Sequence, residues 1–215
     1  MLRIIIAALL VTFNLTTFAA DTFPVSANKV SPILIGSMLP DVNFLTLEGK
    51  QTTLKSQLNG KPAVVVFYRG GWCPYCNLQL SGLRLIKKDL DALGFQLIAI
   101  SLDRPEELKL SLDKLTLDYT LLSDAKTLGV SAFGIGYRVD AATLEKYKSY
   151  NIDLEKASGE KHHILPVPSV FITDAEGMLQ FSYVNPDHRA RLPETVILEA
   201  AKVIAEKKQY LQLKK

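Results

Sequence analysis

The sequence predicts an α/β fold in which a central mixed sheet is flanked by helices. Residues 63–68 are a continuous apolar run and residues 95–102 a mostly apolar one, and both have the length of buried strands in a parallel sheet. Each run is followed by apolar residues at helical spacing, which is the alternation of a parallel α/β sheet. Residues 169–184 are then predicted to form two strands joined by a turn at 174–177, so that an antiparallel hairpin completes the sheet.

The helix after the first strand is the most clearly marked element. Starting from Cys73, one face collects apolar side chains at helical spacing, namely Leu80, Leu83, Ile86, Leu90 and Leu93. Gly94 is expected to end this helix, because glycine readily adopts the left-handed conformation that follows a last helical turn. After the second strand, Pro105 is expected to begin a helix that continues to about Leu115, with two glutamates in its first turn.

The other elements are shorter. They comprise a small hairpin over 42–47 and 51–54, a helical turn at 55–58, a strand at 119–122, a helix at 127–133 and a last helix at about 193–211. Residues 134–161 interrupt the alternation, with a helix predicted at 141–150 and a polar loop at 151–160. We interpret this segment as an insertion on the surface of one domain, since it has too few apolar residues for a core of its own.

The chain of 215 residues is predicted to hold one folded domain at 39–211, preceded by an irregular arm at 21–38. Residues 1–20 are expected to be a secretory signal peptide, because a short basic start precedes an apolar stretch and a small-residue cleavage site after Ala19 or Ala20. An uncleaved anchor is the alternative, but the apolar stretch is short for a span of about 20 residues. We therefore expect export, to the periplasm, and no stable membrane association after cleavage.

The charge balance argues against a partner that is a polyanion. The chain has 25 basic and 22 acidic residues, and loss of Arg3 with the signal peptide leaves 24 against 22, a net charge of +2. Proteins that bind nucleic acid or anionic lipid through their charge carry a larger basic excess. We expect no nucleic-acid partner.

The residues with the most reactive chemistry lie in one stretch, Tyr68-Arg69-Gly70-Gly71-Trp72-Cys73-Pro74-Tyr75-Cys76, which holds the only two cysteines. The first turn of a helix has unpaired N–H groups and the positive end of the dipole, and both favour a thiolate over a thiol. Pro74 suits the first helical position because it has no N–H to leave unpaired. Cys73 is expected at the very end of the helix, open to solvent and substrate, with the Cys76 sulfur within its reach. The spacing therefore predicts a redox-active pair.

Two other uses of the cysteine pair are weaker. A zinc site would need two more ligands, and His162 and His163 are neighbours whose side chains point opposite ways in an extended segment. A permanent structural disulfide would gain little from closing so small a loop. We expect neither a metal nor another cofactor.

Several stretches carry a resemblance to known proteins. They are Val66-Phe67-Tyr68-Arg69-Gly70-Gly71-Trp72-Cys73-Pro74-Tyr75-Cys76-Asn77-Leu78, the run Pro168-Ser169-Val170-Phe171-Ile172-Thr173-Asp174, residues 150–154 and residues 183–187. Together they resemble the thioredoxin-fold superfamily over about residues 39–211, and within it the peroxiredoxin-like branch (alkyl hydroperoxide reductase/thiol-specific antioxidant). The resemblance implies a thioredoxin-like fold in which Cys73 is the exposed nucleophile, Cys76 resolves it, and Pro168 is a cis-proline facing both.

Three neighbours of the cysteines are expected to support them. Arg69 either stabilises the thiolate and holds a nearby anion, or is a solvated turn residue; the sequence leaves both open. Trp72 is expected to shield one side of the sulfurs, with simple packing as the alternative. Tyr75 is expected to be exposed and to help contact a partner.

Two activities follow from the resemblance and the motif. The first is a thioredoxin-dependent, peroxiredoxin-like peroxidase, in which Cys73 forms a sulfenic acid, condenses with Cys76, and is reduced by an external dithiol donor. The second is an exported thiol–disulfide oxidoreductase of the thioredoxin or glutaredoxin kind that acts on protein disulfides; a non-catalytic redox sensor or binding module is a third class. The sequence departs from the peroxiredoxin motif, since Val66 and Gly70 stand where that motif has a proline and a threonine or serine. A hydroxyl that orients peroxide is therefore missing.

Overall fold

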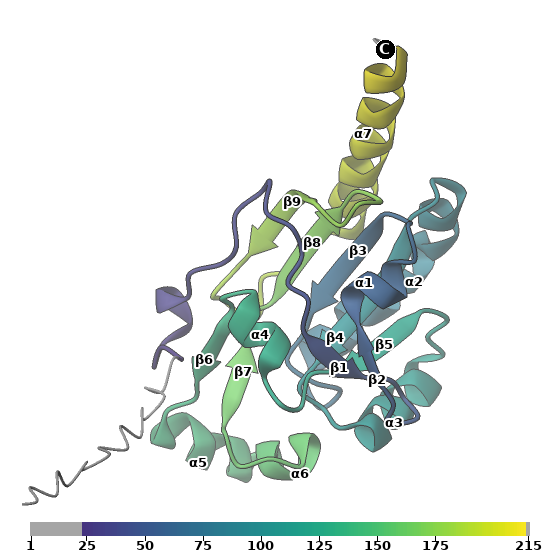
Figure 1. Cartoon of the computed structure of the whole chain (residues 1–215). Coiled ribbons are helices and arrows are strands. Elements are labelled where there is room, and N and C mark those ends of the chain that lie inside the picture. The colour runs from purple at the N-terminus through teal and green to yellow at the C-terminus, as the bar shows by residue number, and fades with distance from the viewer. Residues whose placement is uncertain (1–22, 214–215) are drawn as a thin grey trace, which may run out of the picture.

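The computed structural model describes residues 23–213, and a mixed sheet of seven strands lies at the centre of that part (Figure 1). These strands are β1 (Asn43–Leu45), β2 (Gln51–Thr53), β3 (Ala63–Phe67), β4 (Gln96–Ser101), β5 (Thr120–Ser123), β8 (Ser169–Thr173) and β9 (Leu179–Val184). Their order is β2-β1-β5-β4-β3-β8-β9, with β3, β4 and β5 parallel and the outer pairings antiparallel. The predicted α/β fold with a central mixed sheet is confirmed. The expected signal peptide, with Ala19 and Ala20, lies outside the described residues.

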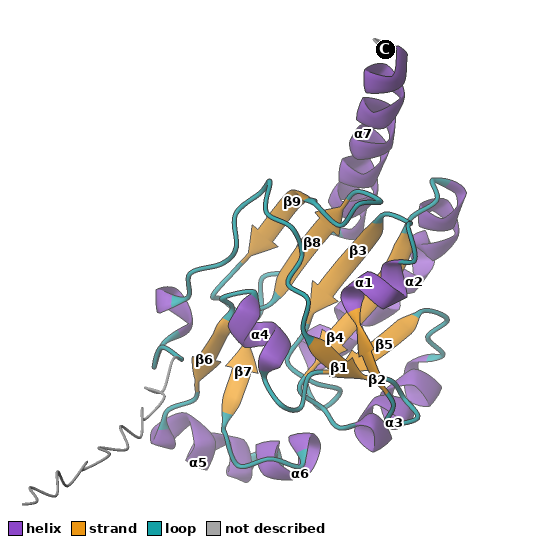
Figure 2. Cartoon of the chain, in the orientation of Figure 1, coloured by secondary structure: helices purple, strands orange, loops and turns teal. Residues whose placement is uncertain are grey.

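Helices cover both faces of the sheet (Figure 2). They are α1 (Leu54–Leu58), α2 (Pro74–Ala92), α3 (Pro105–Leu115), α4 (Leu128–Ala132) and α7 (Glu194–Leu213). The side chains of β3 alternate between the two faces, as a strand requires. Val64 and Val66 pack in the cluster that contains the inward residues of α2, α3 and α7. Ala63, Val65 and Phe67 pack in the cluster that includes residues of α1 and α4.

Helix α2 has the boundaries that its sequence predicts. Cys73 is the N-cap and Pro74 the first helical residue, while Gly94 follows the helix with a φ of +81°. The inward face is formed by buried leucines and an isoleucine, Leu80, Leu83, Ile86 and Leu90. The helix start is therefore fixed by local sequence, and its position on the sheet by burial of this apolar face.

The segment 134–161 is more ordered than the sequence suggests. It contains β6 (Gly136–Arg138), which pairs with β7 (Ile164–Pro166), and the predicted helix α5 (Ala141–Ser149). The predicted polar loop at 151–160 is wrong, because a short helix α6 (Leu154–Ser158) lies there. The Asp153 carboxylate accepts from the Lys156 N–H at 2.9 Å at its start, and Gly159 ends it with a φ of +75°.

The insertion also shares a small apolar cluster with the redox motif. Val139, Leu154 and Leu165 are its buried members, and half-buried Trp72 and Tyr147 pack against them. This cluster seats α5 and α6 next to the end of the sheet where the cysteines lie, as Figure 1 shows for the helices.

The N-terminal arm is irregular, as predicted, apart from a 3₁₀ turn η1 (Ala27–Lys29). Its backbone is hydrogen-bonded to the start of β9: the Gly36 N–H donates to the Leu179 carbonyl at 2.8 Å, and the Leu179 N–H donates to the Ser37 carbonyl at 2.9 Å. These bonds cover the first residue of an edge strand. Within residues 23–213, no helix is long and apolar enough to cross a membrane.

Candidate active site

Four segments that are far apart in the sequence meet at one end of the sheet, the end that the carboxyl termini of β3 and β4 form. The parallel strands β3 and β4 end there, and β8 starts there because it is antiparallel, with Ser169 opposite Phe67. Strand β9 ends at the same edge, where Val184 lies opposite Ser169. The loops after β3, β4 and β9 and the insertion before β8 therefore converge on the cysteine motif.

Cys73 and Cys76 lie at the start of α2 as free thiols. The Cys73 carbonyl accepts from the Cys76 N–H at 3.1 Å and the Asn77 N–H at 3.0 Å, which closes the first turn. The expectation that Cys73 is exposed is wrong: it is 1% exposed, and Cys76 is 0% exposed. The physical reason is that both sulfurs belong to the main apolar cluster, against which Trp72 packs.

The two thiols have opposite pKa shifts. The pKa of Cys73 is lowered to about 6, first by the hydrogen bond from the Cys76 side chain, then by the Cys76 backbone N–H and the charges of Arg69 and Arg191. Burial acts in the other direction on Cys73 without reversing the result. Burial raises the pKa of Cys76 well above its usual range, and the hydrogen bond with Cys73 raises it further. In this arrangement the Cys73 thiol loses its proton more readily than the Cys76 thiol does, and the thiolate is the reactive form of cysteine.

Arg69 is buried, with 3% of its surface exposed, so the solvated-turn alternative is wrong. Its Nη2–H donates a hydrogen bond to the Tyr147 hydroxyl from helix α5. The guanidinium carbon lies 5.0 Å from the centre of the Trp72 ring and 5.4 Å from that of Tyr147. The rings of Trp72 and Tyr147 are themselves 5.8 Å apart. Trp72 thus packs against the sulfur-containing cluster on one side and contacts the guanidinium on another.

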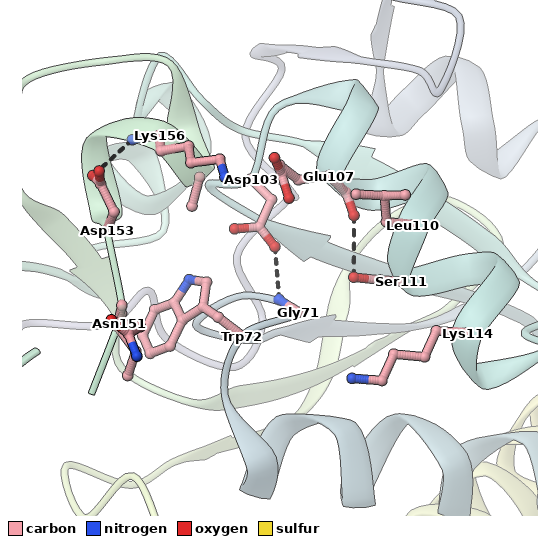
Figure 3. A pocket seen from close by; sticks show the side chains of 12 residues that line it. Gly71, Trp72, Asp103, Glu107, Leu110, Ser111, Lys114, Asn151, Asp153 and Lys156 are labelled. Carbon is pink, nitrogen blue, oxygen red and sulfur yellow. Dashed lines mark hydrogen bonds between the residues drawn. The ribbon is translucent and has the colours of Figure 1, made fainter. Parts of the chain in front are cut away.

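A buried carboxyl lies behind the cysteine loop. Asp103, two residues after β4, is 2% exposed and accepts a hydrogen bond from the Gly71 N–H at 2.7 Å. Burial raises the pKa of Asp103 to about 7. Figure 3 shows this carboxyl pointing at Gly71. Both residues line a cavity of about 270 Å³, whose wall also includes Trp72 and, from α3, Glu107 and Ser111.

The surroundings of Gly70 leave no room for the threonine or serine that the peroxiredoxin motif has at this position. Its φ is +150°, and a Cβ at this position would lie 2.3 Å from Trp72 Nε1 and 2.7 Å from Asp103 Oδ1. A threonine or serine would therefore collide with two neighbours of the site.

Sequence reasoning missed Arg191, Tyr147 and Asp103. Arg191 Nη2–H donates to the Cys76 sulfur at 3.3 Å, and its Nε and Nη1 are shielded from solvent without a partner among the described residues. Asp103 had a signal, since a polar residue directly after a buried parallel strand marks the ligand-facing edge of an α/β sheet. Arg191 and Tyr147 had none, because they lie in a loop and an insertion.

The prediction of a cis bond before Pro168 is wrong, because no cis peptide bond occurs in residues 23–213. Cis is the minority form of X–Pro bonds, and the extended link from β7 to β8 is hydrogen-bonded as it stands. The Val167 N–H donates to the Ile135 carbonyl at 2.8 Å, and the Pro168 carbonyl accepts from the Asn185 N–H at 3.2 Å. Pro168 is buried at the edge of the sheet where the cysteine loop lies.

Tyr75 and the two histidines considered as zinc ligands are placed as follows. Tyr75 is 43% exposed, as expected, and its ring lies 5.9 Å from that of His188. His162 contacts the Ala125 carbonyl at 3.0 Å, and His163 contacts the Glu155 carboxylate at 2.9 Å. In the part of the chain that the structure describes, no group of three or more His, Cys, Asp and Glu side chains is arranged to hold a metal ion.

Comparison with known proteins shows the family of this chain. The model of the AhpC/TSA family matches residues 35–182. The chain is 34% identical over 106 residues to a putative peroxiredoxin bcp of Haemophilus influenzae, an alignment that covers 49% of this chain and 68% of that protein. It is 31% identical over 106 residues to peroxiredoxin Bcp of Escherichia coli, covering 49% and 67% respectively.

Solved structures give the same fold at lower identity. Peroxiredoxin Q of Xanthomonas campestris superposes with a TM-score of 0.61 at 18% identity, covering 82% of this chain and 98% of that one. Peroxidoxin BcpB of Mycobacterium tuberculosis superposes with a TM-score of 0.60 at 19% identity, covering 79% and 97%. The chain therefore belongs to the AhpC/TSA family of thioredoxin-fold, peroxiredoxin-like proteins.

Proposed function

We propose that this protein is a thiol-dependent peroxidase that reduces hydroperoxides through Cys73, with Cys76 as the resolving thiol. The activity is that of the peroxiredoxins to which the chain is related. The single observation that carries the assignment of roles is electrostatic. Cys73 stands at the start of α2, where the hydrogen bond from the Cys76 side chain, helped by the charges of Arg69 and Arg191, lowers its pKa to about 6, so that it is a thiolate at neutral pH.

The reaction has three steps. The Cys73 thiolate attacks the O–O bond of a hydroperoxide, ROOH, and becomes a sulfenic acid, Cys73–SOH; the leaving alkoxide takes a proton to give ROH. Cys76 gives up its proton and attacks the Cys73 sulfur, forming the disulfide and releasing water. An external dithiol donor then reduces the disulfide and is itself oxidised. The sum is ROOH and a dithiol converted to ROH, water and a disulfide.

The burial of Cys73 favours a small oxidant over a protein disulfide. Attack on a protein disulfide requires the Cys73 thiolate of the reduced protein to reach a sulfur on another folded surface, and in this reduced form Cys73 is only 1% exposed. The external dithiol donor acts on the oxidised form instead. A hydroperoxide is small enough to enter between side chains. The related proteins are also peroxiredoxins, so thiol–disulfide exchange with proteins is not the favoured activity.

Single-cysteine variants test the assignment. In Cys73→Ser, peroxide consumption by the reduced protein should be lost. In Cys76→Ser, the first step should remain but turnover should stop, and a sulfenic-acid probe such as dimedone should label Cys73 after one equivalent of hydrogen peroxide. If Cys73→Ser still consumes peroxide while Cys76→Ser does not, the roles are reversed. Reduction of insulin disulfides without any peroxide consumption would favour the other activity.

We also propose that the protein is exported to the periplasm, with residues 1–20 removed as a signal peptide. The support is the basic start, the apolar stretch and the small residues Ala19 and Ala20. N-terminal sequencing of protein recovered from the periplasm should begin at Ala20 or Asp21. Recovery of soluble cytoplasmic protein with an intact Met1 would contradict this localisation.

A further inference from the structure

The inserted helix α5 contacts the cysteine loop through Tyr147. The Arg69 guanidinium donates to the Tyr147 hydroxyl and stacks at 5.0–5.4 Å from the Trp72 and Tyr147 rings. The two aromatic rings are inclined at 52° to each other. The guanidinium of the loop is therefore bounded by an indole from its own loop and a phenol from 78 residues further along the chain.

Arg69 has no carboxylate partner in the part of the chain that the structure describes. It is 3% exposed, and among residues 23–206 no acidic side chain lies within ion-pair distance of it. Its Nε is shielded from solvent and has no hydrogen-bond partner among the same residues. A buried guanidinium is costly unless an opposite charge compensates it. The thiolate of Cys73, on which the charge of Arg69 acts, can supply such a charge.

We propose that Tyr147 is a positioning residue that holds the Arg69 guanidinium beside Cys73 and so controls how readily the thiolate forms. The inserted segment 134–161 then belongs to the active site. The inference deepens the proposed function, on which it rests for the identity of the attacking sulfur. A long arginine side chain can take many rotamers unless its neighbours fix one. Around Arg69, the Tyr147 hydroxyl and the rings of Tyr147 and Trp72 are the neighbours that do so.

Other groups also face Cys73. They are Cys76 of α2, Arg191 before α7, Asp103 after β4 and Tyr137 of β6. Cys76 and Arg191 favour the thiolate, and an ionised Asp103 opposes it. Tyr137 stays neutral near pH 7, because burial raises its pKa to about 12. Changes confined to Tyr147 leave these groups in place, so the response of Cys73 reports on Arg69.

The test is the pH dependence of Cys73 alkylation in the reduced full chain. Iodoacetamide labels thiolates, and mass spectrometry separates label on Cys73 from label on Cys76. Tyr147→Phe keeps the ring against Trp72 and removes the acceptor for Arg69. We expect it to raise the pKa of Cys73 by about 0.5–1 pH unit, which is part of what a neighbouring opposite charge contributes. The matched control is Tyr150→Phe, one residue beyond α5, where Tyr150 is 62% exposed and contacts Lys146.

A double-variant cycle shows whether the effect passes through Arg69. Arg69→Gln should raise the pKa of Cys73 by at least as much, and Tyr147→Phe should add nothing in the Arg69→Gln background. Arg69→Lys is a second probe that keeps the charge but loses the stacked fork, and it should also raise the pKa. The inference is overturned if Tyr147→Phe behaves like Tyr150→Phe, or if it causes the same rise with and without Arg69.

This experiment separates the inference from the proposed function, because alkylation uses no peroxide. If Tyr147→Phe raises the pKa of Cys73 as expected but the protein consumes no peroxide, the peroxidase activity is contradicted and the positioning role stands. Peroxide turnover with an unresponsive Cys73 would do the reverse. Trp72 is the only tryptophan in the chain, so its emission checks in each variant that the cluster around Arg69 remains folded.

Discussion

Asp103→Asn is expected to stabilise the reduced protein, and to do so increasingly as the pH rises. Burial raises the pKa of Asp103 from 3.8 to about 7. Between these two values the folded chain keeps a proton that the unfolded chain has lost. The folded state therefore loses stability as the pH rises through that window, and the loss is constant above it. An asparagine carries no charge and can still accept the hydrogen bond from the Gly71 N–H.

The magnitude follows from the difference between the two pKa values. About 3 pH units at about 1.4 kcal/mol each give a cost of roughly 4 kcal/mol above the folded pKa. Between about pH 5 and about pH 8, the advantage of Asp103→Asn should grow by about 3 kcal/mol. This growth is independent of any fixed change in packing or hydrogen bonding, since a fixed change is the same at both pH values.

The assay is urea unfolding of the wild type and of Asp103→Asn in excess reductant at both pH values. Asp124, whose pKa burial also raises to about 7, contributes the same pH dependence to both proteins and cancels in the difference. Asp41→Asn, at an exposed position before β1, is the control and should show no such growth. A difference in unfolding free energy that stays constant with pH, or shrinks as the pH rises, would refute the reasoning.

Two further substitutions probe the loop and the resolving cysteine. Gly70→Thr restores the hydroxyl of the family motif, yet we expect it to destabilise the protein by about 1–3 kcal/mol in urea unfolding and to lower peroxide consumption, because its Cβ meets Trp72 and Asp103 at a φ of +150°. Arg191→Gln removes the hydrogen bond to the Cys76 sulfur and a charge that favours both thiolates, so disulfide formation should slow and the Cys73 sulfenic acid should persist longer in dimedone trapping.

Both substitutions have a matched control. Gly94→Ala introduces a Cβ at a φ of +81° with no atom within 4 Å, so it measures backbone strain without the collision. Arg189→Gln removes an arginine two residues before Arg191 that pairs with Asp187 at 3.0 Å, and it should leave sulfenic-acid lifetime unchanged. Higher activity in Gly70→Thr, or equal lifetimes in the two arginine variants, would contradict these expectations.

The sequence by itself determined the elements of the fold and the redox motif. Strand β3 is a run of apolar residues, α2 has apolar residues at helical spacing, and the Cys73–Cys76 spacing places both sulfurs in the first helical turn. These features are local, because periodicity and helix capping act over a few neighbouring residues. The insertion was less predictable. Its short helix α6 has a capping aspartate and a terminal glycine, but too few apolar residues for a helical pattern to appear.

The tertiary structure alone decided what surrounds the sulfurs. Arg69, Asp103, Tyr147 and Arg191 come from four segments that meet only because β3, β4, β8 and β9 share one edge of the sheet. The hydrogen bond from Cys76 that lowers the pKa of Cys73 is local, but the burial of both sulfurs and the charge of Arg191 depend on these long-range contacts, because desolvation and charge act through space rather than along the chain. The trans form of the Val167–Pro168 bond also depends on tertiary structure, since β7 and β8 lie on either side of this bond and are held in their own sheets.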